Sequence, residues 1–342
     1  MDDAKLPSRT DGVPHGGNVD WATAVFGEPS QGWLDLSTGI NPHAYAFSEI
    51  EDRWWHRLPT TSEIRELCRA AAQYYDVPDA NCVVAVPGSQ AAIQWLPRLR
   101  APTKVAIISP TYGEHRYVWQ SAGHEVADVP TLDAVEDDIS VVIVTNPNNP
   151  DGRLFACDQL DEWRVRLAAR GGFLVVDEAF ADVVPEASIS AMSGREGLVV
   201  LRSFGKFFGL AGLRLGFVLA PASMAADLSR SMGPWAVSGP ALVIAAEAFA
   251  DTGWQAEMRQ RLAIDAVKLD GLLQAAGIET VGGTSLFRLG RVADATLIAE
   301  SLGRSGILVR RFEERPDWLR FGLPGPDDQW ERLARAMAGQ SD

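Results

Sequence analysis

Short apolar runs alternate with amphipathic segments between residues 81 and 220. The runs are rich in β-branched residues and often apolar at consecutive positions, as expected for strands that are covered on both faces. They predict seven strands, at 82–86, 105–109, 125–129, 141–145, 173–176, 198–203 and 215–220. Helical patterns such as 89–99 and 157–169 lie between them. This alternation predicts an α/β fold in three layers, with a seven-stranded, mostly parallel sheet between helices.

The pattern changes after Pro221. Residues 241–273 predict a long helical region that is interrupted near Thr252 and Gly253. Short strands are predicted at 282–289, 307–312 and 318–322, with a helix at 293–302, so a smaller α+β domain is expected. The first forty residues show little periodicity. We therefore expect an N-terminal segment (1–45) that packs on the active site and the small domain, a large domain (46–235) and a small C-terminal domain (236–342).

Composition and charge exclude some classes of protein but do not identify the function. The 342 residues suffice for two domains, and a hydrophobic fraction of 46% with a charged fraction of 22% is ordinary for a soluble globular protein. The net charge of −14 argues against a nucleic-acid surface, and anionic ligands would need local arginines. The polar start resembles no signal peptide, and no apolar run is long enough to span a membrane. Three cysteines fit neither a disulfide framework nor a metal cage, so we expect a cytoplasmic protein without a metal.

Polar residues follow several predicted strands directly. A Gly88-Ser89-Gln90 turn at a helix start offers backbone N–H groups and a hydroxyl to a phosphate, although Ser89 could equally be an ordinary helix cap. Tyr112 follows the next strand and can stack on a planar ring. Asn149 lies in an Asn-Pro-rich turn, which can aim an amide at a ligand or be only a turn. Asp177 ends a buried strand, where a carboxylate needs a partner such as a protonated ring nitrogen.

The stretch from Ser203 to Gly216 (SFGKFFGLAGLRLG) carries the most chemistry. Lys206 lies among apolar neighbours, where a lysine can lose its proton and attack carbonyls. Ser203 and Arg214 can hold a phosphate, the arginine through its planar fork. An aldehyde cofactor that carries a phosphate would use all three groups, and pyridoxal 5′-phosphate (PLP) is such a cofactor. A lone loop lysine is usually a solvated charge, so the ordered spacing carries this hypothesis.

Together these residues, with the NPNNP, DEAF and SFGKxxGLAGLRLG segments, resemble the fold-type I PLP enzymes of the aminotransferase class I/II group over about residues 35–322. The resemblance implies that Lys206 forms the Schiff base and moves protons, and that Asp177 pairs with the pyridine nitrogen. It also implies a homodimer with active sites near the interface. The remaining implied cofactor contacts are Asn149 to the ring oxygen, Tyr112 on the ring, and Ser89, Gln90, Ser203 and Arg214 around the phosphate.

Two positions depart from the family pattern. Phe180 stands where many relatives have a tyrosine, so one hydrogen bond to the ring oxygen is missing. Many relatives also have a tyrosine near residues 55–59 that reaches a phosphate across the dimer. This chain has none there, and Arg57 is a candidate substitute.

Residues other than those expected to bind the cofactor carry a second resemblance. His15-Gly16-Gly17-Asn18 and the segment 34–42, which includes Asn41, are similar to threonine-phosphate decarboxylases of cobalamin biosynthesis. Two adjacent glycines let backbone N–H groups approach an anion. Arg310 with its neighbour Arg311, and Arg320, which matches the arginine for the substrate α-carboxylate, would give a phosphorylated amino acid two cationic sites. For Arg310 and Arg311 a solvated strand end is an equal alternative.

The resulting hypothesis is PLP-dependent decarboxylation of L-threonine O-3-phosphate to (R)-1-amino-2-propanol O-2-phosphate. Histidinol-phosphate aminotransferase is the alternative, because it shares most of these motifs and also binds a phosphorylated amine. A protein of this fold kept as a binding partner without turnover is a third possibility, since fold alone does not decide function.

Overall fold

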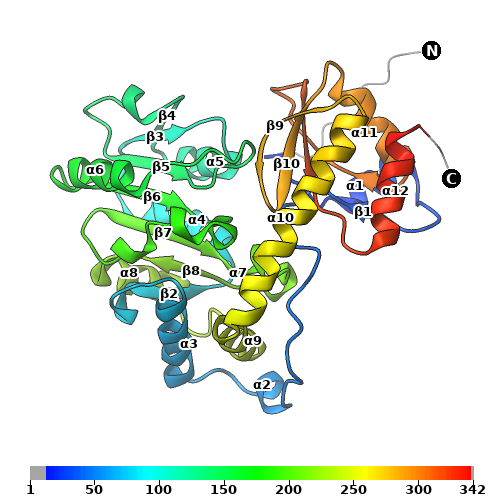
Figure 1. Ribbon diagram of the computed structural model, residues 1–342. Helices are drawn as coiled ribbons and strands as arrows, with labels where there is room; N and C mark the ends of the chain where they lie inside the picture. Colours follow the sequence, from blue (N-terminus) through cyan, green and yellow to red (C-terminus); the bar gives the residue numbers. More distant parts are fainter. Residues whose placement is uncertain (1–12, 340–342) are drawn as a thin grey trace. The chain divides into compact units, whose positions relative to one another are not determined.

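The predicted buried strands form one seven-stranded sheet in a computed structural model, which describes residues 13–339 (Figure 1). The strand order is β2-β8-β7-β6-β5-β3-β4. Pairs from β7 to β4 are parallel, and β8 is antiparallel to both of its neighbours. This confirms the predicted sheet to within about one residue at each strand end. The bounds are β2 (Val83–Val86), β3 (Lys104–Ile108), β4 (Glu125–Val129), β5 (Val141–Thr145), β6 (Phe173–Asp177), β7 (Leu198–Ser203) and β8 (Gly216–Leu219).

Both faces of this sheet are covered. Every residue of β5 and β6 is buried, and parallel strands show this pattern when helices lie on either side. Helix α4 (Ser89–Trp95) contacts β7 and β8, and α6 (Cys157–Ala168) contacts β6. The predicted three-layer arrangement is therefore confirmed. The other helices here are α2 (Arg53–His56), α3 (Thr61–Tyr74), α5 (Gly113–Ser121), α7 (Phe204–Phe207), α8 (Ala222–Met232) and α9 (Gly239–Ala250).

Strand direction brings the predicted cofactor residues to one edge of the sheet. The carboxyl ends of the parallel strands β3, β5, β6 and β7 share that edge. Because β8 runs against β7, its amino end lies there too, just after Arg214. Strand β2 runs against β8, so its carboxyl end, followed by Gly88, returns to the same edge. Ligands of open α/β sheets bind at this edge.

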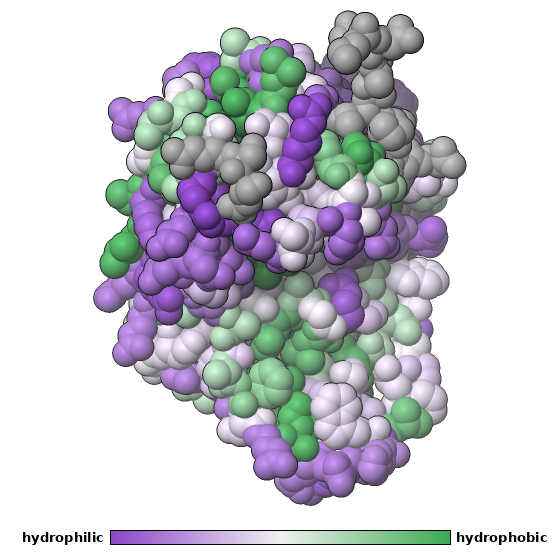
Figure 2. All heavy atoms as spheres, turned by 90° about the vertical axis from the view of Figure 1, so that its right-hand side faces the viewer, coloured by the Kyte–Doolittle hydropathy of each residue, from purple (hydrophilic) through white to green (hydrophobic). Residues whose placement is uncertain are grey.

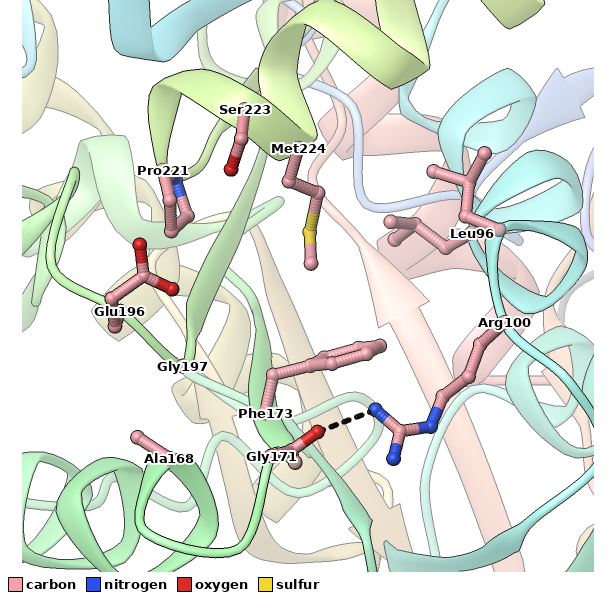
Figure 3. Close-up of a pocket in the computed structure, with 12 residues that line it drawn as sticks. Leu96, Arg100, Ala168, Gly171, Phe173, Glu196, Gly197, Pro221, Ser223 and Met224 are labelled. Atoms are coloured by element: carbon pink, nitrogen blue, oxygen red, sulfur yellow. Dashed lines mark hydrogen bonds between the residues drawn. The ribbon is translucent and has the colours of Figure 1, made fainter.

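The opposite edge holds a cavity of about 230 Å³ (Figure 3). Its lining includes Phe173 at the amino end of β6, Gly197 before β7 and Pro221 after β8. Arg100 lies at its side and donates from Nη1 to the carbonyl of Gly171 at 2.8 Å. None of the predicted site residues lines this cavity, so the chemistry is to be sought at the other edge.

A four-stranded antiparallel sheet, in the order β12-β13-β10-β9, forms the core of the rest of the chain. The single strand predicted at 282–289 is wrong, because a turn at residues 285–286 divides it into β9 (Glu279–Thr284) and β10 (Phe287–Arg291). The strand predicted at 307–312 is also divided. Its first half, β11 (Ile307–Leu308), pairs with β1 (Leu34–Asp35), and its second half, β12 (Arg310–Arg311), pairs with β13 (Trp318–Gly322).

Two units result, His43–Arg259 and residues 13–42 with 260–339. We call them the sheet unit and the small unit. The sequence placed the end of the large domain at residue 235, whereas the sheet unit continues through α9. The stretch 252–253, where an interruption was predicted, is the start of a new helix. Helices of the small unit are α1 (Val19–Phe26), α11 (Ala295–Arg304) and α12 (Asp327–Met337), and α10 (Thr252–Ala275) begins in the sheet unit. Among the described residues, no helix is both long and apolar enough to cross a membrane.

Candidate active site

Asp177 ends β6 with its carboxylate buried and only 3% of the residue exposed. Its Oδ1 accepts from the backbone N–H of Ala179 at 3.2 Å, and its Oδ2 lies 2.9 Å from Nε2 of His115 on α5. His115 is itself 1% exposed. Since a buried carboxyl group is costly without hydrogen bonds, these contacts stabilise the side chain of Asp177 at the sheet edge. A carboxyl group in this position can pair with the nitrogen of a cofactor ring.

Lys206 is half-buried on the short helix α7, directly after β7. Phe207 and Phe208, which follow it, are fully buried and pack with other aromatic rings of the sheet unit. Phe208 stacks on Trp254 at 5.6 Å, and Phe207 meets the same ring edge-on at 5.4 Å. Aromatic pairs of this kind stabilise beyond their buried area. The turn that carries Lys206 is therefore anchored by buried aromatic side chains.

Phe180 is the residue that departs from the tyrosine of many relatives. It is 5% exposed, and its ring lies 5.5 Å from Nζ of Lys206. This distance is within reach of a cation–π contact with the lysine ammonium. The ring therefore faces the reactive lysine, and its position offers no hydroxyl to a ligand.

The predicted phosphate residues converge on the turn after β2. Gly88 has φ +82°, and a Cβ built there would lie 2.7 Å from Nη2 of Arg214. Only glycine leaves the guanidinium room to lie over the turn. Arg214 adopts the left-handed conformation and donates from Nη1 to the carbonyl of Ala211 at 3.0 Å. Ser89 opens α4, and a Cβ at Gly216 would meet its backbone nitrogen at 2.5 Å. Glycines thus bring Ser89 and Arg214 together, as a phosphate cradle requires.

Two consecutive asparagines in the loop after β5, Asn148 and Asn149, have different environments. Asn148 is buried, and its Nδ2 donates to the carbonyl of Pro110 at 2.9 Å and to Asp151 at 2.7 Å. Its Oδ1 accepts from Thr111 at 2.7 Å. Asn148 thus holds the loop together, whereas Asn149 is half-buried at its surface. Asn149 is therefore the better placed of the two to donate to a ligand oxygen.

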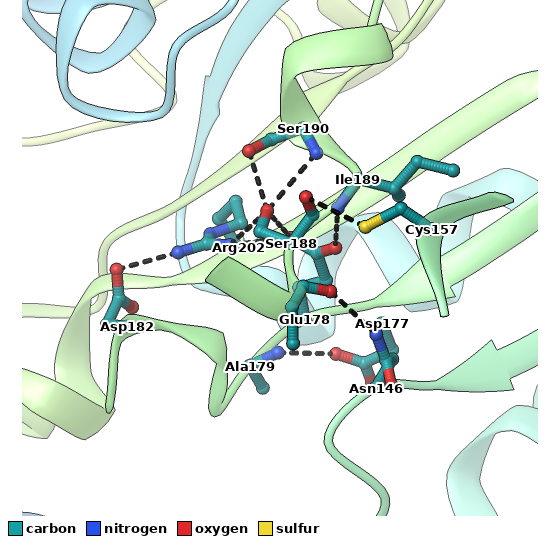
Figure 4. Close-up of polar contacts among 11 residues, drawn as sticks. Asn146, Cys157, Asp177, Glu178, Ala179, Asp182, Ser188, Ile189, Ser190 and Arg202 are labelled. Carbon is teal, nitrogen blue, oxygen red and sulfur yellow. Dashed lines mark hydrogen bonds and ion pairs between the residues drawn. The ribbon is translucent and has the colours of Figure 1, made fainter. Parts of the chain in front are cut away.

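Next to Asp177 lies a buried ion network that spans the ends of β6 and β7 (Figure 4). Arg202 donates to Glu178 at 2.6 Å and to Asp182 at 2.7 Å, and all three are at most 2% exposed. Burial raises the pKa of Glu178, although Arg202 draws it down. Burial works to lower the pKa of Arg202, but the two carboxylates outweigh it and raise that pKa. Because Glu178 follows Asp177 and Arg202 precedes Ser203, the network fixes both strand ends that carry cofactor residues.

In the small unit, the predicted segment 15–18 docks on Ser37, in the bend that follows β1. The backbone N–H of Gly17 donates to Oγ of Ser37 at 2.7 Å, and that hydroxyl donates to Asp35 at 2.5 Å. Gly16 touches the Ser37 carbonyl so closely that a Cβ would not fit. Asn18 uses its Oδ1 to cap α1 by accepting from the N–H of Trp21 at 3.0 Å. His15 is exposed.

The predicted cationic residues lie on the strands beside this segment. Arg310 on β12 donates to the carbonyl of Pro14 at 2.7 Å, and Arg320 on β13 donates to the carbonyl of Ser37 at 2.8 Å. The two arginines are register partners on β12 and β13. Arg320 is 6% exposed, and Asn41 is 2% exposed. The small unit therefore gathers both arginines around the segment 14–18, with Arg311 as the half-buried neighbour of Arg310.

Arg57 was the candidate substitute for a missing tyrosine. It pairs with Glu63 of α3, with Nη1 at 2.9 Å from Oε2, and its guanidinium lies 5.0 Å from the ring of Trp54. Hydrogen bonding to Arg57 lowers the pKa of Glu63 to about 2. Within one chain, Arg57 is thus engaged in a local helix-start structure.

Sequence reasoning missed His115, the ion network and the role of Ser37. A signal for His115 was present, because Tyr112 and His115 are three residues apart at the start of a helix and so share a face. The rings of the two residues meet edge-on at 6.1 Å. The network of Arg202 had no such signal, since its members come together only when β6 and β7 pair.

These side chains fit PLP. A buried carboxylate at the end of the central strand β6, a half-buried lysine after β7 and a glycine-lined cradle with Arg214 match the ring nitrogen, the aldehyde and the phosphate. Asn149 and Tyr112 follow β5 and β3, which lie on the other side of β6 from the cradle. Within the sheet unit, the residues predicted to bind the cofactor are thus brought to one edge.

The comparisons with known proteins agree with this chemistry. The chain is 43% identical to a threonine-phosphate decarboxylase of Pseudomonas aeruginosa, over 96% of this chain and 98% of that protein. It is 45% identical to one from a Sinorhizobium species, over 95% and 98%. A histidinol-phosphate aminotransferase of Aeromonas salmonicida is 29% identical over 83% of both chains.

Solved structures show the same fold at lower identity. The histidinol-phosphate aminotransferase of Sinorhizobium meliloti, in complex with pyridoxal-5′-phosphate, matches with a TM-score of 0.82 and 19% identity over 99% of this chain and 98% of that one. The L-threonine-O-3-phosphate decarboxylase of Porphyromonas gingivalis matches with 0.72 and 20% over 88% and 100%. The model of the family "Aminotransferase class I and II" matches residues 32–337. The chain therefore belongs to the aminotransferase class I and II family of PLP-dependent enzymes.

Proposed function

We propose that this protein decarboxylates L-threonine O-3-phosphate to (R)-1-amino-2-propanol O-2-phosphate, as a step of cobalamin biosynthesis. The observation that carries the proposal is 43–45% identity to two threonine-phosphate decarboxylases over nearly the whole chain. Relatives named histidinol-phosphate aminotransferase share 29–34% over 69–83% of the chain. In this proposal the segment 15–18 and the arginines beside it supply the anion-binding groups of the small unit.

The residues of the sheet unit have distinct tasks in this reaction. PLP, when bound, supplies an electron sink for the pair of electrons left behind by departing carbon dioxide. Asp177 holds the proton on the pyridine nitrogen, and His115 keeps Asp177 in place. Lys206 carries the reactive amine and later delivers a proton to Cα of the substrate. Asn149 donates to the ring oxygen, which Phe180 cannot do.

Phosphate and carboxylate groups are held by separate residues. Ser89, Ser203 and Arg214 bind the phosphate of the cofactor. Arg310 and the segment 15–18 bind the phosphate of the substrate, and Arg320 orients its carboxylate. Asn41 lies in the same unit and is assigned to the substrate as well. A carboxylate that must leave needs orientation more than tight binding, because only interactions that strengthen in the transition state raise the rate.

A carbon dioxide assay tests the proposal. Purified protein with PLP is incubated with L-threonine O-3-phosphate without any 2-oxo acid, and released carbon dioxide is measured. Stoichiometric release is expected, and Lys206→Ala should abolish it. Glutamate that forms from histidinol phosphate and 2-oxoglutarate, with no carbon dioxide from threonine phosphate, would instead identify an aminotransferase. PLP binding without either product would leave the third alternative, a protein without turnover.

We also propose a homodimer. Exposed large apolar residues lie on the sheet unit, with Trp55 62% exposed, Leu58 59% and Trp235 55%. Figure 2 shows apolar residues in the lower part of one face, above a rim of polar residues at its lower end. Contiguous exposed apolar surface commonly marks an interaction site. Light scattering should give twice the mass of one chain, and Trp55→Glu with Leu58→Glu should shift that mass toward one chain.

A cytoplasmic location is a further proposal. It rests on the three cysteines, which are all unpaired, two of them buried. Unpaired thiols suit a reducing compartment. Cell fractionation with detection of the native protein tests this location.

A further inference from the structure

A chain of side-chain hydrogen bonds connects α4 and α5 at the edge that carries the cofactor residues. The hydroxyl of Tyr112 donates to Oε1 of Gln90 at 3.2 Å. Nε2 of the same glutamine donates to Oε2 of Glu114 at 2.7 Å. Gln94, one turn further along α4, donates to that oxygen at 3.3 Å. The amide of Gln90 is therefore engaged at both ends, which sets its orientation.

Glu114 makes this arrangement hard to disturb. It is 6% exposed in the first turn of α5, and a buried carboxylate needs hydrogen-bond donors. The bond from Gln90 to this buried carboxyl group is short, at 2.7 Å. Rotation of the Gln90 amide to aim the group elsewhere would break this bond and the bond from Tyr112. The two contacts therefore hold the side chain of Gln90 between Tyr112 and Glu114.

Tyr112 links this group to the ring-nitrogen acid. Its ring meets His115 edge-on, and His115 contacts Asp177. One side of Tyr112 is therefore restrained by Gln90 through its hydroxyl, and another by His115 through its ring. A tyrosine that stacks on a cofactor ring must be held at a fixed tilt, and these two contacts supply the restraint.

We propose that Gln90 is a positioning residue, which orients the Tyr112 ring for stacking on the cofactor, and is not a ligand of the cofactor phosphate. Phosphate binding is then left to Ser89, Ser203 and Arg214 and to backbone N–H groups. The proposal rests on PLP as the cofactor and not on the reaction that follows. It differs from the role that the family resemblance implied for Gln90.

The two roles differ in the part of the cofactor that they hold. A phosphate ligand stabilises PLP but not pyridoxal, which lacks the phosphate. A residue that orients Tyr112 stabilises both molecules by the same factor, because both present the same ring. The comparison of the two dissociation constants therefore separates the roles without any measurement of turnover.

The experiment uses the full-length apoprotein, Gln90→Met, Tyr112→Phe and their double variant. Dissociation constants for PLP and for pyridoxal are measured by quenching of tryptophan fluorescence. Loss of the neutral bond between Tyr112 and Gln90 should weaken both ligands about threefold to tenfold in Tyr112→Phe, and at least as much in Gln90→Met, which also removes the bond to Glu114. The double variant should be no weaker than Gln90→Met, since Tyr112→Phe removes only a bond that Gln90→Met has already removed. Arg214→Met should, in contrast, weaken PLP far more than pyridoxal.

Gln94→Met is the matched control. It removes a bond of the same kind to the same carboxylate oxygen, but Gln94 makes no hydrogen bond to Tyr112 among those described. Both dissociation constants should stay within twofold of the wild-type values. If Gln90→Met does not fold, Tyr112→Phe tests the same bond from the other side.

Two results would overturn the proposal. One is a weakening of PLP with pyridoxal unchanged in Gln90→Met, which would make Gln90 a phosphate ligand. The other is additive losses in the double variant, which would make the two residues independent. If the wild-type protein binds PLP but releases no carbon dioxide, the proposed reaction fails while the role of Gln90 is still decided. A wild-type protein that binds no PLP would sink both.

Discussion

The sheet unit and the small unit hold their candidate residues in different ways. In the sheet unit, side chains hold side chains, as in the contacts of Asp177 with His115 and of Arg202 with Glu178. In the small unit, arginines hold backbone carbonyls, as in the contacts of Arg310 with Pro14 and of Arg320 with Ser37. A substitution that removes a charge from the first arrangement leaves another charged or polar side chain buried without its partner. The second arrangement depends on the backbone path of residues 14–18 and 37, which lie outside strands. Substitutions in the two units should therefore alter different measurable quantities.

The largest expected effect is on stability, in the buried ion network of the sheet unit. Arg202→Met leaves Glu178 and Asp182 buried without their guanidinium. Removal of one partner from such a network costs about 3–5 kcal/mol, because the remaining charge is uncompensated. Urea unfolding should show a loss of this size. The triple variant Arg202→Met, Glu178→Met, Asp182→Leu should recover most of it, and a single variant as stable as the wild type would show that the network does not stabilise the strand ends.

Asp177→Asn should act on catalysis and spare substrate binding. An asparagine keeps the shape but cannot hold the ring nitrogen protonated. Removal of one preorganised electrostatic group typically lowers kcat about 10²–10³-fold. KM for threonine phosphate should stay within about twofold, because the side-chain hydrogen bonds of Asp177 join it to His115 and Ala179 of the sheet unit, and the substitution leaves the small unit unchanged. A rise in KM as large as the fall in kcat would contradict the division of tasks between the units.

Ser37→Ala should do the reverse. It removes the acceptor of the Gly17 N–H and the donor to Asp35, and so loosens the segment 15–18. Loss of hydrogen bonds worth about 0.5–1.5 kcal/mol should raise KM about twofold to twelvefold, while the visible absorbance of the bound cofactor is unchanged. Thr23→Val is the control, because it removes a hydroxyl bonded to Trp33 in the same unit. Altered absorbance in Ser37→Ala, or a raised KM in the control, would count against the comparison.

The sequence was informative to different degrees in the two units. The short, β-branched apolar runs of β5 and β6 are typical of strands covered on both faces, so the sheet and the polar residues at its strand ends were predictable. The turn at 285–286 was not predicted, because it includes Leu286, which is apolar and buried like its neighbour Phe287 in β10. Strands β11 and β12 are adjacent in sequence, but they join different sheets, which only tertiary pairing decides. Lys206 and Asp177 were found from local segments. His115 and Arg202 act through partners 62 and 20–24 residues away, which a local pattern does not reveal.

A smaller loss of stability is expected at the exposed start of α3, which also contains an ion pair but, unlike the network of Arg202, is not buried. Thr60 caps α3 by accepting from the N–H of Glu63 at 3.3 Å, while Glu63 accepts from the N–H of Thr60 at 2.8 Å and pairs with Arg57. Thr60→Ala should cost about 1 kcal/mol, the usual value for a lost cap. This loss is well below the loss expected for Arg202→Met, although Thr60 is hydrogen-bonded to the ion-paired residue Glu63.

The pH dependence of this exposed group gives a sharper test. Arg57 lowers the pKa of Glu63 to about 2, below the value of about 4.3 for an unfolded chain. The folded state thus binds fewer protons than the unfolded state between these values, so the contribution of Glu63 is complete above about pH 4.3 and is lost as the pH falls toward 2. The stability difference between wild type and Glu63→Gln, measured by urea unfolding, should be constant from pH 7 to 5 and shrink below pH 4. Because an exposed pair is screened by salt, 0.5 M NaCl should also reduce it. A difference that persists unchanged at pH 2.5 would mean that the helix start depends on the shape of Glu63 and not on its charge.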